Sequence, residues 1–303
     1  MVALLPSAVM AGLLLMGSIS AAAAQVQTDS AALPQAGDLT LAAPAGSVLI
    51  GLTVRPAMPG PNTLLVYVMP LAGPAAAVDV PVDLLVNGSE VPLQLCSRNC
   101  RTADVDLQGG EHIDLMASND TGGTASFDLP TLPAPDGTSL LDQEQARMRQ
   151  LKTYRIDEAL GPADPPAQTA YTYQAPNRTR VEASNGFQMV WVGTTRYSRR
   201  SPGENWQVDD AGITLPVPTL VWDTRRPTDT YVGAHILGVE TRDGVDTRIL
   251  GFLLNAGRSP YWFRLWVDAD GLVHRAEMRG QGHFMDQDFS AFDEPLTVDV
   301  PTA

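Results

Sequence analysis

The sequence lacks every catalytic signature that short motifs reveal. It contains no G-x-S-x-G nucleophile elbow, no H-E-x-x-H zinc-binding pair, no phosphate-binding glycine loop and no calcium-loop spacing of acidic residues. Paired carboxylates such as Asp209-Asp210, or Asp286 with Asp288, stand in polar segments without the apolar surroundings that would tune one of them as an acid. The sequence therefore predicts a protein that is not an enzyme.

Cysteine is almost absent. The 2 cysteines, Cys96 and Cys100, are spaced C-x3-C within one local segment. In an oxidising compartment we expect them to close a small disulfide loop. A copper-binding or redox pair is the alternative, and His112 is the only further ligand nearby.

Histidine is also scarce, and the 4 residues are scattered along the chain. The best cluster of soft ligands lies near the carboxyl end, where alternation puts His283 and Met285 on one face of a strand, close to Met278. Copper is the ion that such ligands would select. Structural roles for these residues are the alternative, in which case no cofactor is expected.

Basic residues are outnumbered, with 20 Lys and Arg against 34 Asp and Glu and a net charge of −14. Nucleic acid and anionic lipid surfaces repel such a chain. They are therefore not expected as partners.

Residues 1–24 contain no charge at all. An apolar run, Ala3 to Met16, leads to an Ala-x-Ala cleavage pattern that ends at Ala24, which is typical of an export signal. The alternatives are a retained membrane helix, since ~20 apolar residues span a bilayer, or the last helix of a longer membrane protein. No cysteine follows the run, so a bacterial lipoprotein anchor is not expected. Each alternative places the rest of the chain outside the cytoplasm, in the periplasm or at the cell surface.

Aromatic residues are nearly missing from the first 138 residues, which hold Tyr67 and Phe127, whereas the rest of the chain holds 17. This shift predicts two domains joined by a stiff Pro-rich segment. The expected order is a signal peptide or membrane helix (1–24), a linker (25–44), a β-sandwich (45–129), a Pro-rich linker (130–138) and a second domain (139–303).

Short strands separated by Pro-Gly, Asn-Gly and Gly-Gly turns indicate an antiparallel sandwich in the first domain. The expected strands are 47–54, 63–69, 78–86, 103–107 and 112–116. With the Arg55-Pro-Ala-Met-Pro-Gly-Pro-Asn62 segment, residues 45–129 resemble the extracytoplasmic immunoglobulin-like (FixH/YtkA-like) domains attached to copper-resistance D-type membrane proteins. That resemblance implies copper handling in the cell envelope beside a membrane protein partner. The mature start, Gln25, departs from the amino-terminal His that the related copper-resistance C-type family uses.

The stretch Tyr261 to Met285 predicts a hairpin with two different faces. If Asp270-Gly271 forms a two-residue type I′ turn, Arg264 lies opposite Glu277 and Trp266 opposite Arg275. The other face is then apolar. It consists of Phe263, Leu265 and Val267 against His274, Ala276 and Met278. This face needs a cover, which is either an ordinary core or an apolar ligand.

The Trp266-Val-Asp-Ala-Asp-Gly-Leu-Val-His-Arg-Ala-Glu-Met278 run and the segment after it resemble the end of the LolA/LppX-like lipoprotein-carrier half-barrel. Leu151 to Glu158, Tyr171 to Arg178 and Val190 to Tyr197 resemble its earlier strands in the expected order. The resemblance covers residues 139–303. It implies a curled antiparallel sheet that wraps a helix and holds lipid.

A helix is expected from about residue 140 to 150, with Ser139 as its N-cap, Asp142 as the partner in a short capping box, and Leu141, Met148 and Leu151 on one face. Two strands, 231–239 and 247–254, flank the turn at Arg242-Asp-Gly-Val. Before them, Pro202 to Pro227 forms a long irregular segment that carries Trp206 and Trp222. It is either a lid over a cavity or a surface excursion.

Taken together, these patterns predict a mainly β, non-enzymatic cell-envelope protein. Its sandwich precedes a half-barrel with a packed helix, and the half-barrel binds a lipid or another apolar ligand. The expected ligand-binding residues are Phe263, Leu265, Val267, Met278, Trp206 and Trp222. Copper handling, and a purely structural or interaction protein with a filled barrel, are the alternatives.

Overall fold

The computed structural model describes residues 33–71, 80–97, 99–118, 122–161, 165–223, 229–256 and 259–302. The predicted signal peptide or membrane helix, residues 1–24, lies outside this range. Among the described residues, no helix is both long and apolar enough to cross a membrane.

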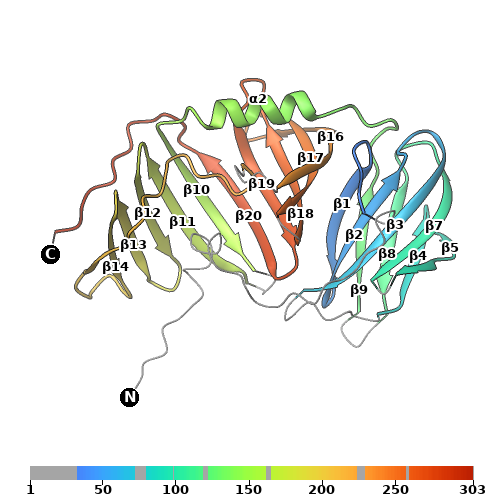
Figure 1. Ribbon diagram of the computed structural model, residues 1–303, viewed down its shortest axis with the longest axis horizontal. Helices are drawn as coiled ribbons and strands as arrows, with labels where there is room; N and C mark the ends of the chain where they lie inside the picture. Colours follow the sequence, from blue (N-terminus) through green and yellow to red (C-terminus); the bar gives the residue numbers. More distant parts are fainter. Residues whose placement is uncertain are drawn as a thin grey trace, which may run out of the picture.

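Two antiparallel sheets form the amino-terminal part (Figure 1). The five-stranded sheet has the order β1-β2-β3-β7-β6 and the four-stranded sheet the order β5-β4-β8-β9. The bounds are β1 (Leu39–Ala45), β2 (Val48–Arg55), β3 (Gly60–Pro70), β4 (Val82–Val86), β5 (Ser89–Val91), β6 (Gln94–Ser97), β7 (Cys100–Leu107), β8 (His112–Ala117) and β9 (Gly123–Asp128). Aliphatic side chains from both sheets fill one shared core, which is the packing expected of a sandwich.

Strand β1 corrects the expected linker of residues 25–44. Leu39 to Ala45 pair residue by residue with β2, from Leu39 opposite Val54 to Ala45 opposite Val48. Leu39 is fully buried, so core packing decides the conformation of a segment whose alanines and proline give little local strand signal.

The second part is an 11-stranded antiparallel sheet in the order β15-β14-β13-β12-β11-β10-β20-β19-β18-β17-β16, crossed by helix α2 (Thr138–Met148). Its strands are β10 (Thr153–Leu160), β11 (Ala167–Gln174), β12 (Arg178–Ala183), β13 (Gln188–Val192), β14 (Thr195–Arg199), β15 (Gln207–Asp210), β16 (Thr230–Arg242), β17 (Val245–Ala256), β18 (Ser259–Val267), β19 (Val273–Gly280) and β20 (His283–Ser290). Neither this sheet nor the others close into a barrel. The predicted fold class, mainly β with a packed helix, is confirmed.

Helix α2 lies across the upper ends of the central strands (Figure 1). We call the sheet face that it covers the inner face. The predicted cap is wrong, because the helix begins at Thr138 and Gly137 occupies the N-cap position without a side-chain hydrogen bond. Asp136 instead accepts the Thr138 N–H at 3.0 Å. The Asp136 carboxylate, just before the first turn, thus accepts a backbone N–H of the helix start, a role that was expected of Ser139 and Asp142.

The hairpin between β18 and β19 has the predicted register over most of its length. Arg264 lies opposite Glu277 and Trp266 opposite Arg275. The predicted two-residue turn is wrong, because a register shift puts Val267 opposite Val273 and leaves a five-residue loop, Asp268 to Leu272. The Asp268 carboxylate accepts the backbone N–H groups of Asp270 and Leu272 at 2.9 and 2.8 Å and holds this wider loop.

Other turns follow the sequence more closely. Asp243 and Gly244, at φ 50° and 81°, form the predicted two-residue turn between β16 and β17. The segment 190–197, expected as one strand, is instead a hairpin that turns at Gly193-Thr194. The segment 202–227 is not irregular throughout, since Gln207 to Asp210 form edge strand β15; its residues 224–227 lie outside the described range.

The sandwich packs beside the β16–β18 end of the large sheet (Figure 1). Leu49 and Leu71 from the sandwich meet Leu253, Trp262 and Phe284 from the large sheet in a buried apolar cluster. Gly51 lies against the Trp262 ring, where a Cβ atom would come within 2.5 Å of it. A side chain at position 51 would therefore push the two parts apart.

Candidate ligand-binding face of the half-barrel

The inner face of the large sheet is lined with aromatic and aliphatic side chains at every second position of its strands. The register brings Tyr173 opposite Tyr154 and Phe252 opposite Phe263. Both pairs stack, with ring centroids 4.6 and 5.3 Å apart. The face therefore offers a continuous apolar surface from β11 to β17.

A chain segment other than α2 also covers this face. We call it the strap, residues Ala211 to Asp223. It buries Val217, Leu220 and Trp222 in the inner core, at 9%, 7% and 0% exposure. The Trp222 ring meets Phe263 and Phe289 edge-on at 6.5 and 5.6 Å. The strap thus covers part of the inner face beside α2.

Polar contacts hold the strap in place. The Tyr154 hydroxyl accepts the Thr219 N–H at 3.1 Å, and the Tyr231 hydroxyl donates to the Trp222 carbonyl at 2.6 Å. Arg149, just beyond the end of α2, donates hydrogen bonds to both carboxylate oxygens of Asp223, at 2.5 and 2.6 Å. These are discrete bonds and not a strand ladder.

Glu144 is the buried partner of the strap tryptophan. It lies on the covered face of α2 at 0% exposure and accepts the Trp222 Nε1–H at 3.0 and 3.2 Å. Burial raises the pKa of Glu144 well above its ordinary value, and Asp223 adds to the rise, whereas the Trp222 hydrogen bond and Arg149 oppose it.

A second buried carboxylate, Glu158, lies on the same face of the sheet. It accepts hydrogen bonds from the Tyr171 hydroxyl at 2.8 Å and from the Gln287 amide at 2.6 Å. Burial raises the pKa of Glu158, and the two hydrogen bonds oppose the rise. Both of its oxygens are engaged, so Glu158 has hydrogen-bond partners in its buried position.

The predicted ligand-binding residues fall into two groups. Phe263, Leu265, Val267 and Trp222 are buried together in the inner core, and Met278 packs against it. Trp206 lies elsewhere, with the Arg199 guanidinium 4.5 Å above its ring beside β14. Whether any of them touches a ligand stays a prediction.

Glu144 and Glu158 are not among the residues predicted from the sequence, although both follow a periodic pattern. Glu144 is spaced i+3 from Leu141 and i−4 from Met148, which puts it on the apolar helix face. Glu158 continues the alternation of Tyr154 and Ile156 along β10. Each is an acidic residue at a position that the helical or strand periodicity of the sequence assigns to the core.

The proposed soft-metal residues share one sheet region. Met278 lies opposite Met285 across β19 and β20, and His283 lies opposite Gly280. Burial lowers the pKa of His283. Within the described residues, no group of three or more His, Cys, Asp and Glu side chains could hold a metal ion, and the site at His283, Met285 and Met278 stays a prediction.

The predicted disulfide is confirmed. Cys96 of β6 and Cys100 of β7 are bonded, with their Cα atoms 5.2 Å apart. Cys100 is fully buried against Leu65 and Tyr67 on one side of the sandwich. The bond ties edge strand β6 to its neighbour.

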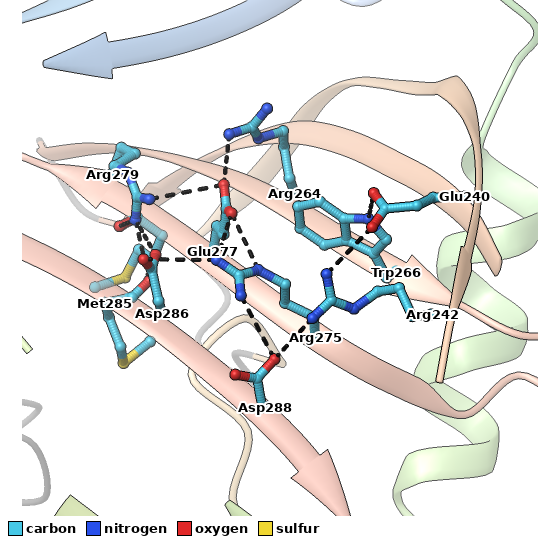
Figure 2. Close-up of polar contacts among 11 residues, drawn as sticks. Glu240, Arg242, Arg264, Trp266, Arg275, Glu277, Arg279, Met285, Asp286 and Asp288 are labelled. Atoms are coloured by element: carbon cyan, nitrogen blue, oxygen red, sulfur yellow. Dashed lines mark hydrogen bonds and ion pairs between the residues drawn. The ribbon is translucent and has the colours of Figure 1, made fainter. Parts of the chain in front are cut away.

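Figure 2 shows a charged cluster on the outer face of the large sheet. Glu277 binds Arg264, Arg275 and Arg279 at 2.5, 2.9 and 3.7 Å. Burial acts to raise the pKa of Glu277, but the three guanidinium groups outweigh it and lower the pKa. Arg279 and Arg275 in turn contact Asp286 and Asp288 (Figure 2).

Trp266 forms the other half of this cluster. The guanidinium groups of Arg242, Arg264 and Arg275 lie 5.5 to 5.8 Å from its ring, and its Nε1–H donates to Glu240 at 2.7 Å. Cations and carboxylates are interleaved throughout, so the cluster neutralises itself and ties β16 to β18, β19 and β20. It is a structural network and leaves the inner face as the candidate site.

Two cavities lie outside the inner core. One of about 560 Å³ lies at the end of the β16–β17 hairpin, and one of about 230 Å³ lies between the sandwich and the large sheet. The first is lined by Val239, Glu240, Thr241, Asp246, Thr247, Arg248, Val267 and Ala269. Neither is lined by Phe263, Leu265 or Met278, whereas Val267 of the inner core borders the first.

Solved structures similar to this chain include those of two mycobacterial proteins. The lipoprotein LppX of Mycobacterium tuberculosis is 14% identical, with 53% of this chain and 97% of that chain covered, at a TM-score of 0.41. LprF of Mycobacterium bovis is 15% identical, with 56% and 100% covered, at a TM-score of 0.40. No family model and no curated protein matches the chain. Nothing in these comparisons supports the resemblance expected for residues 45–129, which stays a prediction.

Proposed function

We propose that this is a non-enzymatic, extracytoplasmic binding protein that holds a lipid or other apolar ligand on the inner face of its half-barrel. The observation that carries the proposal is the strap. An open sheet exposes a broad apolar face, and what covers it beside α2 is an irregular segment held by discrete polar bonds. Displacing the strap would uncover Phe263, Phe289 and their neighbours for a ligand.

Burial of the apolar inner face would supply the binding free energy. Each square ångström of apolar surface kept from water is worth about 25 cal/mol, so an uncovered inner face is unstable by itself. Either the strap or an apolar ligand must lie on it. The two covers then compete, and ligand binding is coupled to the release of the strap.

A fluorescent polyene fatty acid, titrated into the full chain, tests the proposal directly. We expect a saturable rise in its emission. In Arg149→Gln, which loses the ion pair to Asp223 (2.5 Å), we expect tighter apparent binding by about fivefold, because the strap is easier to displace.

Arg147→Gln is the matched control. Arg147 lies on α2 and pairs with Asp293 at 3.3 Å, away from the strap. An equal effect of both substitutions would show that the strap does not gate the site. No saturable binding to either protein would leave a self-filled interaction protein as the better account.

A further inference from the structure

The cavity at the end of the β16–β17 hairpin contains a guanidinium group that lacks a counter-ion. Arg242, Arg264, Arg275 and Arg279 of the neighbouring strands are all ion-paired. The side chain of Arg248 on β17 makes no hydrogen bond or ion pair with any residue that the structure describes. It lines the cavity of about 560 Å³.

The other polar groups of this cavity are already engaged. Glu240 accepts hydrogen bonds from Trp266 and Arg242, at 2.7 and 3.2 Å, on the outer face. Asp246 accepts from the Thr241 hydroxyl at 2.6 Å, and Thr247 donates to the Glu240 carbonyl at 2.7 Å. Asp246 has one oxygen engaged by the neutral Thr241 hydroxyl. Arg248 is the basic residue among the lining residues, and its five N–H donors suit a carboxylate or a phosphate.

Apolar groups flank Arg248 on both sides. The strand register places it directly opposite Val239 on β16 and Val267 on β18. Val239 is 80% exposed, the largest exposed fraction among the large apolar residues described as exposed. Two residues along β17, Leu250 continues the same face into the inner core. A cation therefore lies between the exposed Val239 and the edge of the inner core, where Leu250 and Val267 are fully buried.

We propose that this cavity binds the head group of an anionic amphiphile, with its carboxylate or phosphate on Arg248 and the start of its chain against Val239 and Val267. The inference rests on the proposed function, because the rest of the chain would follow the inner face past Leu250. It narrows the ligand from any apolar molecule to one with an anionic end.

Three probes of equal chain length separate the outcomes: a fluorescent fatty acid, its methyl ester, and the corresponding alkyl phosphate. With the full chain, we expect the acid or the phosphate to bind about tenfold more tightly than the ester. Whichever of the two anions binds with the higher affinity identifies the chemistry of the head group. Arg248→Gln should remove the difference and leave binding of the ester unchanged.

Asp246→Asn is the charge-matched counterpart, since Asp246 lines the same cavity two residues before Arg248. Removing this negative charge should strengthen binding of the anions, by about threefold at low salt. Weaker binding of the anions in this variant would show that their charged end does not lie beside this carboxylate, and would overturn the inference. Equal affinity for all three probes, unaffected by Arg248→Gln, would overturn it while leaving the proposed function intact, whereas no binding of any probe would count against both.

Discussion

The contact between Trp222 and Glu144 shows how one residue pair couples the strap to the helix. A tryptophan needs a partner for its indole N–H when it is buried, and the structure supplies a carboxylate that is itself out of water. A buried carboxylate whose folded pKa is raised takes up a proton more readily in the folded state than in the unfolded state. Glu144 therefore makes the free energy of unfolding smaller as the pH rises above the pKa of this carboxyl in the unfolded chain, which is about 4.3.

Glu144→Gln should therefore stabilise the protein at neutral pH. The amide oxygen still accepts the Trp222 N–H, and no charge is left to bury. We expect a gain of about 1–3 kcal/mol at pH 7, which shrinks toward zero as the pH falls to about 4. Thermal unfolding across this pH range measures it.

Asp142→Asn is the control, because it removes the same charge from an exposed position of the same helix. It should change the melting temperature little at any pH. A Glu144→Gln protein that is less stable than the natural one at pH 7 would show that the carboxylate is ionised and well solvated, contrary to the burial seen here.

At the scale of elements, the loop between β18 and β19 shows where local sequence falls short. The Asp270-Gly271 pair is typical of a two-residue turn. The observed loop has five residues instead, and the Asp268 side chain binds its backbone. Its carboxylate binds two backbone N–H groups and also contacts the His274 Nε2 atom at 2.8 Å. We infer that these bonds outweigh the turn preference of the pair.

Asp268→Ala should therefore destabilise the protein by about 1–3 kcal/mol, since two loop N–H groups lose their acceptor. Urea denaturation measures the change. Asp270→Ala is the comparison, because the Asp270 side chain is exposed at the same loop. If both substitutions cost the same, the Asp268 contacts do not set the loop.

The register of that hairpin, by contrast, could be predicted from the sequence. Alternation and charge pairing decide it, and Arg264 does lie opposite Glu277. The inner-face positions of Phe263 and Leu265 follow from the same alternation. Strand β1 and the conformation of the strap could not be predicted, because contacts with residues far along the chain determine both.

For the whole molecule, the structure presents the inner face as filled by residues of the chain itself. Helix α2, the strap and the stacked aromatics leave Trp222, Phe252 and Leu265 with no exposed surface. We propose that an apolar ligand takes the place of the strap on this face. The sandwich packs against the β16–β18 end of the sheet.

Hydrogen exchange of the strap, measured by mass spectrometry with and without saturating fatty acid, tests this central claim most directly. In the ligand-free state, the N–H groups of Val217 and Thr219 are bonded to the Pro176 carbonyl and the Tyr154 hydroxyl at 2.9 and 3.1 Å. We predict that fatty acid accelerates exchange at both positions while amides of α2 keep their protection. Saturable binding with unchanged or slower exchange of the strap would contradict the account.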